Sequence, residues 1–267
     1  DRARGGGRGL AVEVGAARGR GGRGVGHLAG VGGGGAHALV DVVAMLSGDE
    51  KLVASFERGD DIHNAVASIV FGVSSKEVTP DMRRSAKVIN FGIIYGMGVS
   101  ALQKNLGTTR EKAQQFYDEY FAAFPTIKNY LESTKEYARV HGYTETAFGR
   151  RRYFPTITSK LPFLRSFAER MASNAPLQGT AADIIKLAII AIDNALRVRG
   201  FVGKADLVLQ VHDELVYEVE EACAREVNAI IIQSMIGVID HSPVPLTLTN
   251  VPLTVSSSTG ANLDETK

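Results

Sequence analysis

Residues 79–96 read TPDMRRSAKVINFGIIYG and carry the strongest structural signal in the chain. Thr79 can cap a helix, Pro80 suits its first turn, and Asp81 favours the positive end of the helix dipole. Cations and aromatics then recur at every fourth position, as Arg83, Lys87, Phe91 and Tyr95. At about 100° per residue, this spacing keeps all four on one stripe of a helix. Such a stripe can hold a polyphosphate at its basic end and stack a base at its aromatic end.

Composition is that of a globular protein. The chain has 267 residues, 45% of them hydrophobic, and a formal net charge of +1, so any binding to nucleic acid must depend on local basic patches. The single cysteine, Cys223, excludes an internal disulfide and favours a reducing, cytoplasmic environment. No apolar run approaches the roughly 18 residues of a membrane span. The sequence predicts no membrane segment.

The first part of the chain differs from the rest. Fifteen of the first 40 residues are glycine, and the accompanying arginines outnumber Asp1 and Glu13. Glycine at this density makes ordering costly, and small side chains bury little area in return. One interpretation is an Arg/Gly-rich arm that binds single strands. The other follows from codons, because every residue type before Met45 has a codon that begins with G or C. We therefore expect residues 1–44 to be disordered or translated out of frame.

Beyond Met45, helix and strand signals follow one another. Asp60 or Asp61 can cap a helix that ends before Gly72. Further elements are expected in this order: helices at 99–106, 109–124 and 125–141, a hairpin at 142–155, a long helix at 163–199 bent or broken near Pro176, two strands around 212–214, a helix at 221–238 and closing strands at 244–255.

Three groups of polar side chains stand out along these elements. Arg170, Asn174 and Gln178 are spaced by four, which places hydrogen-bonding groups on one helix face. The turn after Gly149 carries Arg150, Arg151 and Arg152, which can contact phosphates. Gln210, His212, Asp213 and Glu214 lie at or near the tip of the second hairpin. A rigid tip between apolar strands can hold two acids where a cation offsets their desolvation.

The string R-R-x-A-K-x-x-N-F-G-x-x-Y-G in residues 83–96 resembles motif B of the family A, bacterial DNA polymerase I-like, DNA polymerases. Residues 210–214 resemble motif C, and residues 45–63 resemble the segment that follows motif A. The resemblance implies an α+β fold in which a mostly helical fingers subdomain is inserted in an antiparallel-sheet palm. Residues 45–267 would form a partial polymerase domain, with fingers at about 60–160 and the remaining palm at about 161–267.

The resemblance also implies a role for each candidate residue. Arg83 and Lys87 would take the triphosphate of the incoming deoxynucleotide, with Lys87 also assisting catalysis. Phe91 and Tyr95 would stack or gate at the base, with His63 near the nucleotide. The primer–template contacts would be Arg170, Asn174, Gln178, Gln210, His212, Arg150 and Arg151. Asp213 and Glu214 would hold Mg²⁺ in a two-metal site, and the protein would act as a monomer in DNA replication and repair.

One departure from the family limits this interpretation. Family members carry D-Y-S-Q-I-E-L-R at motif A, and without gaps its two acids fall on Gly34 and Leu39. The two-metal site is then incomplete, and we expect the chain to be inactive. Three alternatives remain: a non-catalytic nucleic-acid-binding remnant, a single-subunit RNA polymerase relative, and a metal phosphohydrolase that uses the pair His212-Asp213. The strand-like flanks of that pair argue against the third.

Overall fold

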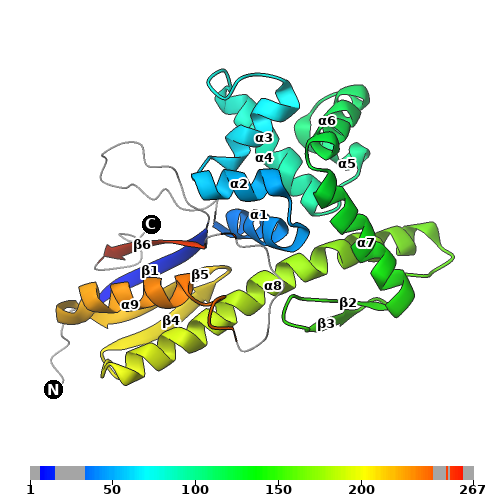
Figure 1. Ribbon diagram of the computed structural model, residues 1–267. Helices are drawn as coiled ribbons and strands as arrows, with labels where there is room; N and C mark the ends of the chain where they lie inside the picture. Colours follow the sequence, from blue (N-terminus) through cyan, green and yellow to red (C-terminus); the bar gives the residue numbers. More distant parts are fainter. Residues whose placement is uncertain (1–6, 16–33, 243–250, 252, 261–267) are drawn as a thin grey trace. The chain divides into compact units, whose positions relative to one another are not determined.

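The computed structural model describes residues 7–15, 34–242, 251 and 253–260 and confirms the α+β class (Figure 1). Four strands form one sheet in the order β4-β5-β1-β6, with each neighbouring pair antiparallel, and β2 and β3 form a separate hairpin. The described elements are β1 Gly7–Gly15, α1 Gly34–Ser47, α2 Glu50–Arg58, α3 Ile62–Phe71, α4 Pro80–Ile94, α5 Val99–Leu106, α6 Arg110–Ala123, α7 Pro125–His141, β2 Tyr143–Glu145, β3 Arg151–Tyr153, α8 Pro162–Val198, β4 Ala205–Val211, β5 Glu214–Glu220, the short 3-10 helix Glu221–Cys223, α9 Ala224–Ile236 and β6 Thr254–Gly260.

The chain divides into two compact units. Unit 1 comprises residues 1–39, 181–246 and 252–267, and unit 2 comprises residues 40–180 and 247–251. Helix α8 runs through the boundary as one helix with Pro176 inside it, so of the two expected outcomes at this proline, a bend or a break, the break is wrong. A proline removes one backbone donor, but the rest of the helix retains its ladder. Most of the predicted closing strand, residues 244–255, lies outside the described residues.

Residues 1–44 are expected to be disordered or translated out of frame; disorder is wrong for residues 7–15 and 34–44, and translation out of frame stays a prediction. Strand β1 pairs with β5 on one side and β6 on the other, with Leu10 opposite both Tyr217 and Thr259. Helix α1 begins at Gly34. Backbone hydrogen bonds to two neighbouring strands are available to any non-proline residue. They stabilise β1 without requiring the large side-chain area that its glycine-rich sequence lacks.

Unit 2 is built around helices α2 to α6, which pack against one another (Figure 1). The predicted caps are present at two helix starts, because Thr79 accepts a hydrogen bond from the Met82 N–H and Thr109 accepts one from the Lys112 N–H. At the start of α3 the cap is Asp61, which resolves the choice between Asp60 and Asp61. The buried large side chains of these helices include Leu52, Val66, Ile89, Ile93, Leu102 and Tyr120.

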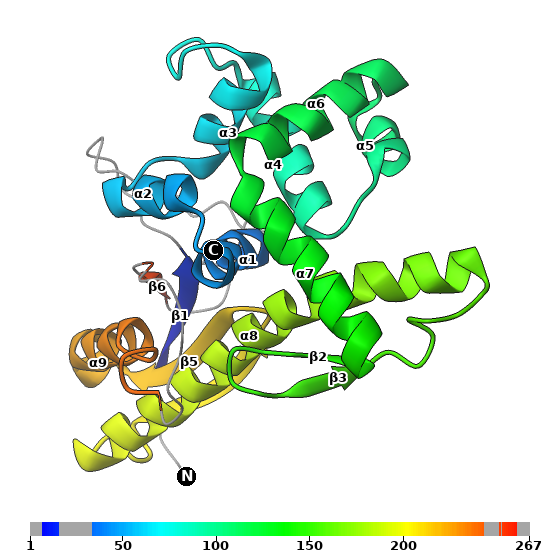
Figure 2. The same ribbon diagram turned by 45° about the vertical axis from the view of Figure 1, so that its right-hand side comes forward.

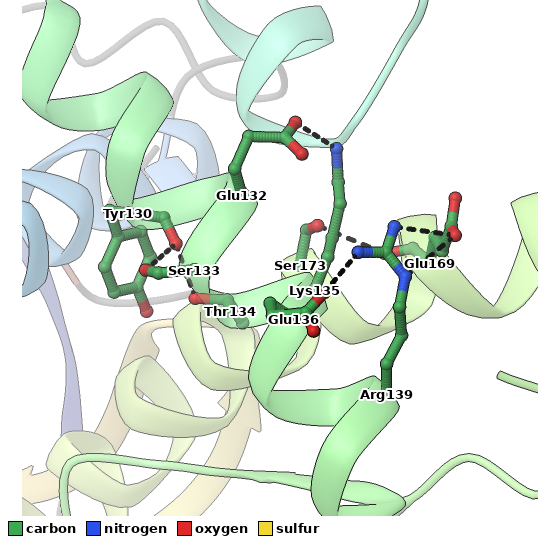
Figure 3. A network of polar contacts seen from close by, with 9 residues as sticks. All are labelled: Tyr130, Glu132, Ser133, Thr134, Lys135, Glu136, Arg139, Glu169 and Ser173. Atoms are coloured by element: carbon green, nitrogen blue, oxygen red, sulfur yellow. Dashed lines mark hydrogen bonds and ion pairs between the residues drawn. The ribbon is translucent and has the colours of Figure 1, made fainter. Parts of the chain in front are cut away.

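The rest of unit 2 joins α7, the β2–β3 hairpin and the N-terminal half of α8. Figure 3 shows Arg139 of α7 between two carboxylates, Glu136 of its own helix and Glu169 of α8. The Arg139 guanidinium lies 2.9 Å from the Glu169 carboxylate and 2.8 Å from that of Glu136. The hydrogen bonds to Glu169 and Glu136 raise the pKa of Arg139 above its ordinary value. A small apolar cluster also belongs to this part of unit 2, formed by Ala138, Phe154, Ile157, Ala168, Ala172 and Ala175.

Gly179 lets the turn of the hairpin approach α8 closely. A Cβ at this position would lie 2.5 Å from Cγ2 of Thr146. Two hydrogen bonds fix the same contact, because Arg150 donates to the Gly179 carbonyl at 3.0 Å and the Ala147 N–H donates to Thr180 Oγ1 at 2.9 Å. The hairpin is therefore docked on α8 through backbone atoms as well as side chains.

We expect Gly179→Ala to destabilise the chain by up to about 2 kcal/mol, measured by chemical unfolding. Alanine gains about 1 kcal/mol over glycine within a helix, but the clash with Thr146 forces a shift that costs about 1–3 kcal/mol. Thr146→Ser provides the control, because it removes Cγ2 and keeps the hydroxyl that accepts from the N–H groups of Phe148 and Arg150. Gly179→Ala is expected to cost less in the Thr146→Ser background, and equal costs in the two backgrounds would contradict the close contact.

Unit 1 contains the four-stranded sheet, and α9 packs along β1, β5 and β6 (Figure 2). Strand β4 is the outer strand on one side of the described sheet, and most of its side chains are exposed, including Leu207, Val208, Leu209 and Val211. A cavity of about 290 Å³ lies beside it, lined by α8, β4 and Tyr217. Helix α8 is long and apolar enough to cross a membrane by length and composition alone. Its apolar residues Ile184, Ala188 and Ile192 are buried within the protein.

Candidate nucleotide and nucleic-acid site

Helix α4 carries the predicted stripe. Arg83, Lys87 and Phe91 are partly exposed along it, and Tyr95, 37% exposed, caps its C-terminal end. The opposite side of α4 is buried through Ala86, Ile89 and Ile93. Burial of one side fixes the rotation of the helix, so the side chains of the stripe stay at the surface of unit 2.

Arg83 at the basic end of the stripe has a partner that the sequence did not indicate. Its Nε and one Nη each lie 2.8 Å from the same oxygen, Oδ2 of Asp61. Partial burial raises the pKa of Asp61, but the hydrogen bond and charge of Arg83 outweigh it and hold that pKa below its usual range. Asp61 is therefore ionised at neutral pH, and it links the start of α3 to the first turns of α4.

The middle of the stripe joins a cation to two rings. Lys87 Nζ lies 6.0 Å from the centre of the Phe91 ring, at the outer range of a cation–π contact. The ring of His63, which is fully buried, meets the Phe91 ring edge-on at 5.3 Å. The structure therefore brings His63, Lys87 and Phe91 together. Burial gives His63 a fixed place behind Phe91.

Asn90 is a second residue whose contact the sequence did not indicate. It lies on the buried side of α4, where its Oδ1 accepts a hydrogen bond of 2.6 Å from the hydroxyl of Tyr120 in α6. Both residues are fully buried. The Nδ2 of Asn90 has no partner among the described residues. The contact fixes α4 against α6 directly beside Phe91 in the chain.

The second group of predicted residues lies on the half of α8 that belongs to unit 2. Arg170 and Gln178 are exposed and Asn174 is partly buried, and Oδ1 of Asn174 is unpartnered within the described part of the chain. Gly96, directly after Tyr95, lies against Arg170, since a Cβ on Gly96 would be 3.4 Å from Cγ of Arg170. The end of the α4 stripe and the start of the α8 face are therefore adjacent.

The hairpin arginines have partners within the protein. Arg150 donates to the Gly179 carbonyl. Arg151 lies 2.6 Å from Glu145 and its guanidinium is 4.5 Å from the centre of the Tyr143 ring, and the Glu145 hydrogen bond raises the pKa of Arg151. Arg152, the third arginine of this cluster, is exposed and lies 5.6 Å from the centre of the Phe154 ring. These contacts order the hairpin.

In unit 1, Asp213 lies in the turn between β4 and β5. Val211 pairs with Glu214, which leaves His212 and Asp213 as the two turn residues. His212 adopts a left-handed backbone with φ of 55°, which is uncommon for residues other than glycine. Its carbonyl accepts a hydrogen bond from Gln210 at 3.3 Å. The predicted hairpin is confirmed, and its four polar residues lie together at its tip.

The carboxylate of Asp213 is suited to a cation. Asp213 is 8% exposed, and its Oδ2 has no hydrogen-bond partner among the described residues. Burial raises the pKa of Asp213, and the neighbouring charge of Glu214 adds to this effect. A cation is the group that best offsets a buried, unpaired carboxylate. A two-metal site needs further ligands, and no cluster of three or more His, Cys, Asp or Glu occurs among the residues described.

Comparison with known proteins gives a consistent result. The family model for DNA polymerase family A matches residues 40–265. DNA polymerase I of Pseudomonas aeruginosa is 46% identical over 224 residues, which is 84% of this chain and 23% of that protein. The thermostable DNA polymerase I of Thermus aquaticus is 46% identical over 197 residues, 74% of this chain and 23% of that protein.

A solved structure is similar along nearly the whole chain. It is the POL domain of Pol1 from M. smegmatis in complex with DNA primer-template and dNTP. The TM-score is 0.83 at 34% identity, covering 99% of this chain and 41% of that one. The chain therefore spans about a quarter of the length of these curated relatives and less than half of the solved domain.

Proposed function

Because the chain belongs to DNA polymerase family A, we propose that it is part of a DNA-directed DNA polymerase whose unit 2 holds an incoming deoxynucleoside triphosphate on α4. The observation that supports this most is the stripe itself: Arg83 and Lys87 lie at its basic end, followed by Phe91 with His63 packed behind it. Cations bind the phosphates and the aromatic ring stacks on the base.

We assign primer–template DNA to the face of α8 next to this stripe. Arg170, Asn174 and Gln178 offer hydrogen-bonding groups that can test the shape of a base pair in the minor groove, where acceptors are alike for all correct pairs. The M. smegmatis domain is in complex with both a DNA primer-template and a dNTP, which supports both partners. Arg150 and Arg151 remain proposed contacts to the phosphate backbone of DNA. Arg151 would contact DNA while it keeps its ion pair with Glu145. Gln210 and His212 are proposed as DNA contacts from unit 1.

The acids at the β4–β5 connection suit Mg²⁺ and would form one part of a two-metal site. Asp213, with Glu214 beside it, would hold the metal, which would neutralise charge that develops during nucleotidyl transfer. Because the described residues do not complete a two-metal site, we propose that this chain binds its partners without extending a primer. The fingers and palm assignments, a monomeric state and a place in the cytoplasm stay predictions.

Binding of a labelled primer–template, followed by fluorescence anisotropy over a range of salt concentrations, tests this function. Phosphate contacts make affinity fall steeply with salt. Gln178→Ala on the proposed DNA face is expected to weaken binding several-fold, because it removes a hydrogen bond worth about 1 kcal/mol. Lys112→Ala changes an exposed cation at the start of α6 and is expected to have a smaller effect. No binding at low salt would refute the proposal.

A further inference from the structure

The ion pair between Arg83 and Asp61 has a specific geometry. Nε and one Nη of Arg83 share Oδ2 of Asp61, each at 2.8 Å. A guanidinium has five N–H donors in a planar fork. This contact uses the side of the fork formed by Nε and one Nη. The other end presents one N–H group from each of the two Nη atoms, and these two N–H groups point away from Asp61.

Asp61 is itself held in place. It is the N-cap of α3, and its Oδ1 accepts the backbone N–H groups of His63 at 3.0 Å and Asn64 at 3.2 Å. Both carboxylate oxygens are therefore engaged, one by the helix and one by Arg83. The carboxylate cannot rotate without losing a cap that typically contributes about 1 kcal/mol. It offers Arg83 a fixed anchor, although both side chains are more than 40% exposed.

We propose that Asp61 is a positioning residue for the incoming triphosphate: it anchors the Nε side of Arg83 and leaves the outer end, with one N–H group from each Nη atom, for the polyphosphate. That end matches the spacing of two phosphate oxygens and binds them bidentately. Ordering a long side chain on binding costs about 0.5–1.5 kcal/mol. The anchor removes part of this cost before the ligand arrives. The inference rests on the proposed function, since it requires that α4 binds a triphosphate.

An opposite role is also physically possible, and it predicts the opposite change in triphosphate affinity when Asp61 is replaced. As an anion beside the binding stripe, Asp61 could compete with phosphate for Arg83, in which case its removal would tighten binding. The engagement of one oxygen by two backbone N–H groups favours the anchoring role, because a competing anion needs no such fixation. The sign of the change in affinity therefore distinguishes the two roles.

Asp61→Asn is the test variant, because asparagine caps a helix as well as aspartate but cannot form the ion pair. Binding to the full chain is measured by calorimetry with dATP and, separately, with inorganic tripolyphosphate, which has no base. We expect Asp61→Asn to weaken both by roughly three- to tenfold. Asp60→Asn is the control: it removes the same charge one residue away, where Asp60 pairs with Arg58 at 2.8 Å. Its affinities are expected to be unchanged.

Arg83→Gln completes the design. It is expected to weaken binding of both probes, and adding Asp61→Asn to it is expected to cause no further loss, because the anchor then holds nothing. Unchanged or tighter binding by Asp61→Asn, with the loss still present in Arg83→Gln, overturns the inference alone. No binding of either probe by the unchanged chain overturns both the inference and the proposed nucleotide site. If Asp61→Asn unfolds, Asp61→Ser, which keeps a capping hydroxyl, replaces it.

Discussion

Primer extension by this chain is expected to be at least about a thousandfold slower than by the polymerase domain of the M. smegmatis relative. A thousandfold corresponds to about 4 kcal/mol of transition-state stabilisation, and a missing carboxylate at a two-metal site typically removes several kcal/mol. Asp213 and Glu214 are neighbours at the β4–β5 connection, so their carboxylates reach a metal site from one side only. The ungapped positions of the motif A acids hold Gly34 and Leu39. Neither residue type can ligate Mg²⁺ through its side chain.

The assay uses a labelled primer–template, Mg²⁺ and all four deoxynucleotides, with the M. smegmatis domain as the positive control. The same samples are tested for DNA binding, so that a lack of extension is not confused with a lack of binding. Robust extension that Asp213→Ala abolishes would contradict the expectation and show that another acid completes the site. Glu13 is then the first residue to replace, because its Cα partner in β5 is Glu214.

Tyr120→Phe is expected to lower the free energy of unfolding by about 1–3 kcal/mol, the usual cost of leaving a buried polar group unsatisfied. The hydroxyl of Tyr120 is the hydrogen-bond donor to Asn90 Oδ1, and both residues are fully buried. Since Asn90 Nδ2 already lacks a partner in the described part of the chain, the substitution leaves both polar atoms of its side chain unpaired. For a chain of this size, a loss of about 1 kcal/mol lowers Tm by roughly 2–4 °C.

Thermal and urea unfolding measure this effect. Tyr153→Phe is the control, because Tyr153 is 65% exposed, so removal of its hydroxyl leaves no buried polar group without a partner. The double variant Asn90→Leu/Tyr120→Phe removes both polar partners, and we expect it to recover part of the stability lost in Tyr120→Phe. A Tyr120→Phe chain as stable as the Tyr153→Phe chain would show that the buried hydrogen bond contributes little.

Features that depend on neighbouring residues were predictable from the sequence. Thr79 and Pro80 mark the start of α4, and the four-residue spacing correctly places Arg83, Lys87 and Phe91 on one side of it. The β4–β5 hairpin was predicted from the two apolar strands that flank Asp213. In each case the signal and the structure lie within a few residues of one another, where capping and periodicity operate.

Features that depend on distant residues were not predictable. Asp61 and Arg83 are 22 residues apart, and Asn90 and Tyr120 are 30 apart. No local pattern connects the members of either pair, because packing of α3 and α6 against α4 brings them together. Strand β1 is a stronger example, since its stability comes from backbone pairing with strands about 200 residues or more away along the chain. Its glycine content argued for disorder, and backbone pairing leaves no signal in side-chain composition.

The outer position of β4 determines how the chain behaves when many copies are present. Leu207, Val208, Leu209 and Val211 are all more than a third exposed on a strand with no described neighbour on one side. An open apolar edge is a template onto which a strand of another copy can add. The rate at which copies meet rises with concentration, whereas the folding of a single copy does not depend on concentration. Dilute samples are therefore the conditions in which single-chain properties can be measured.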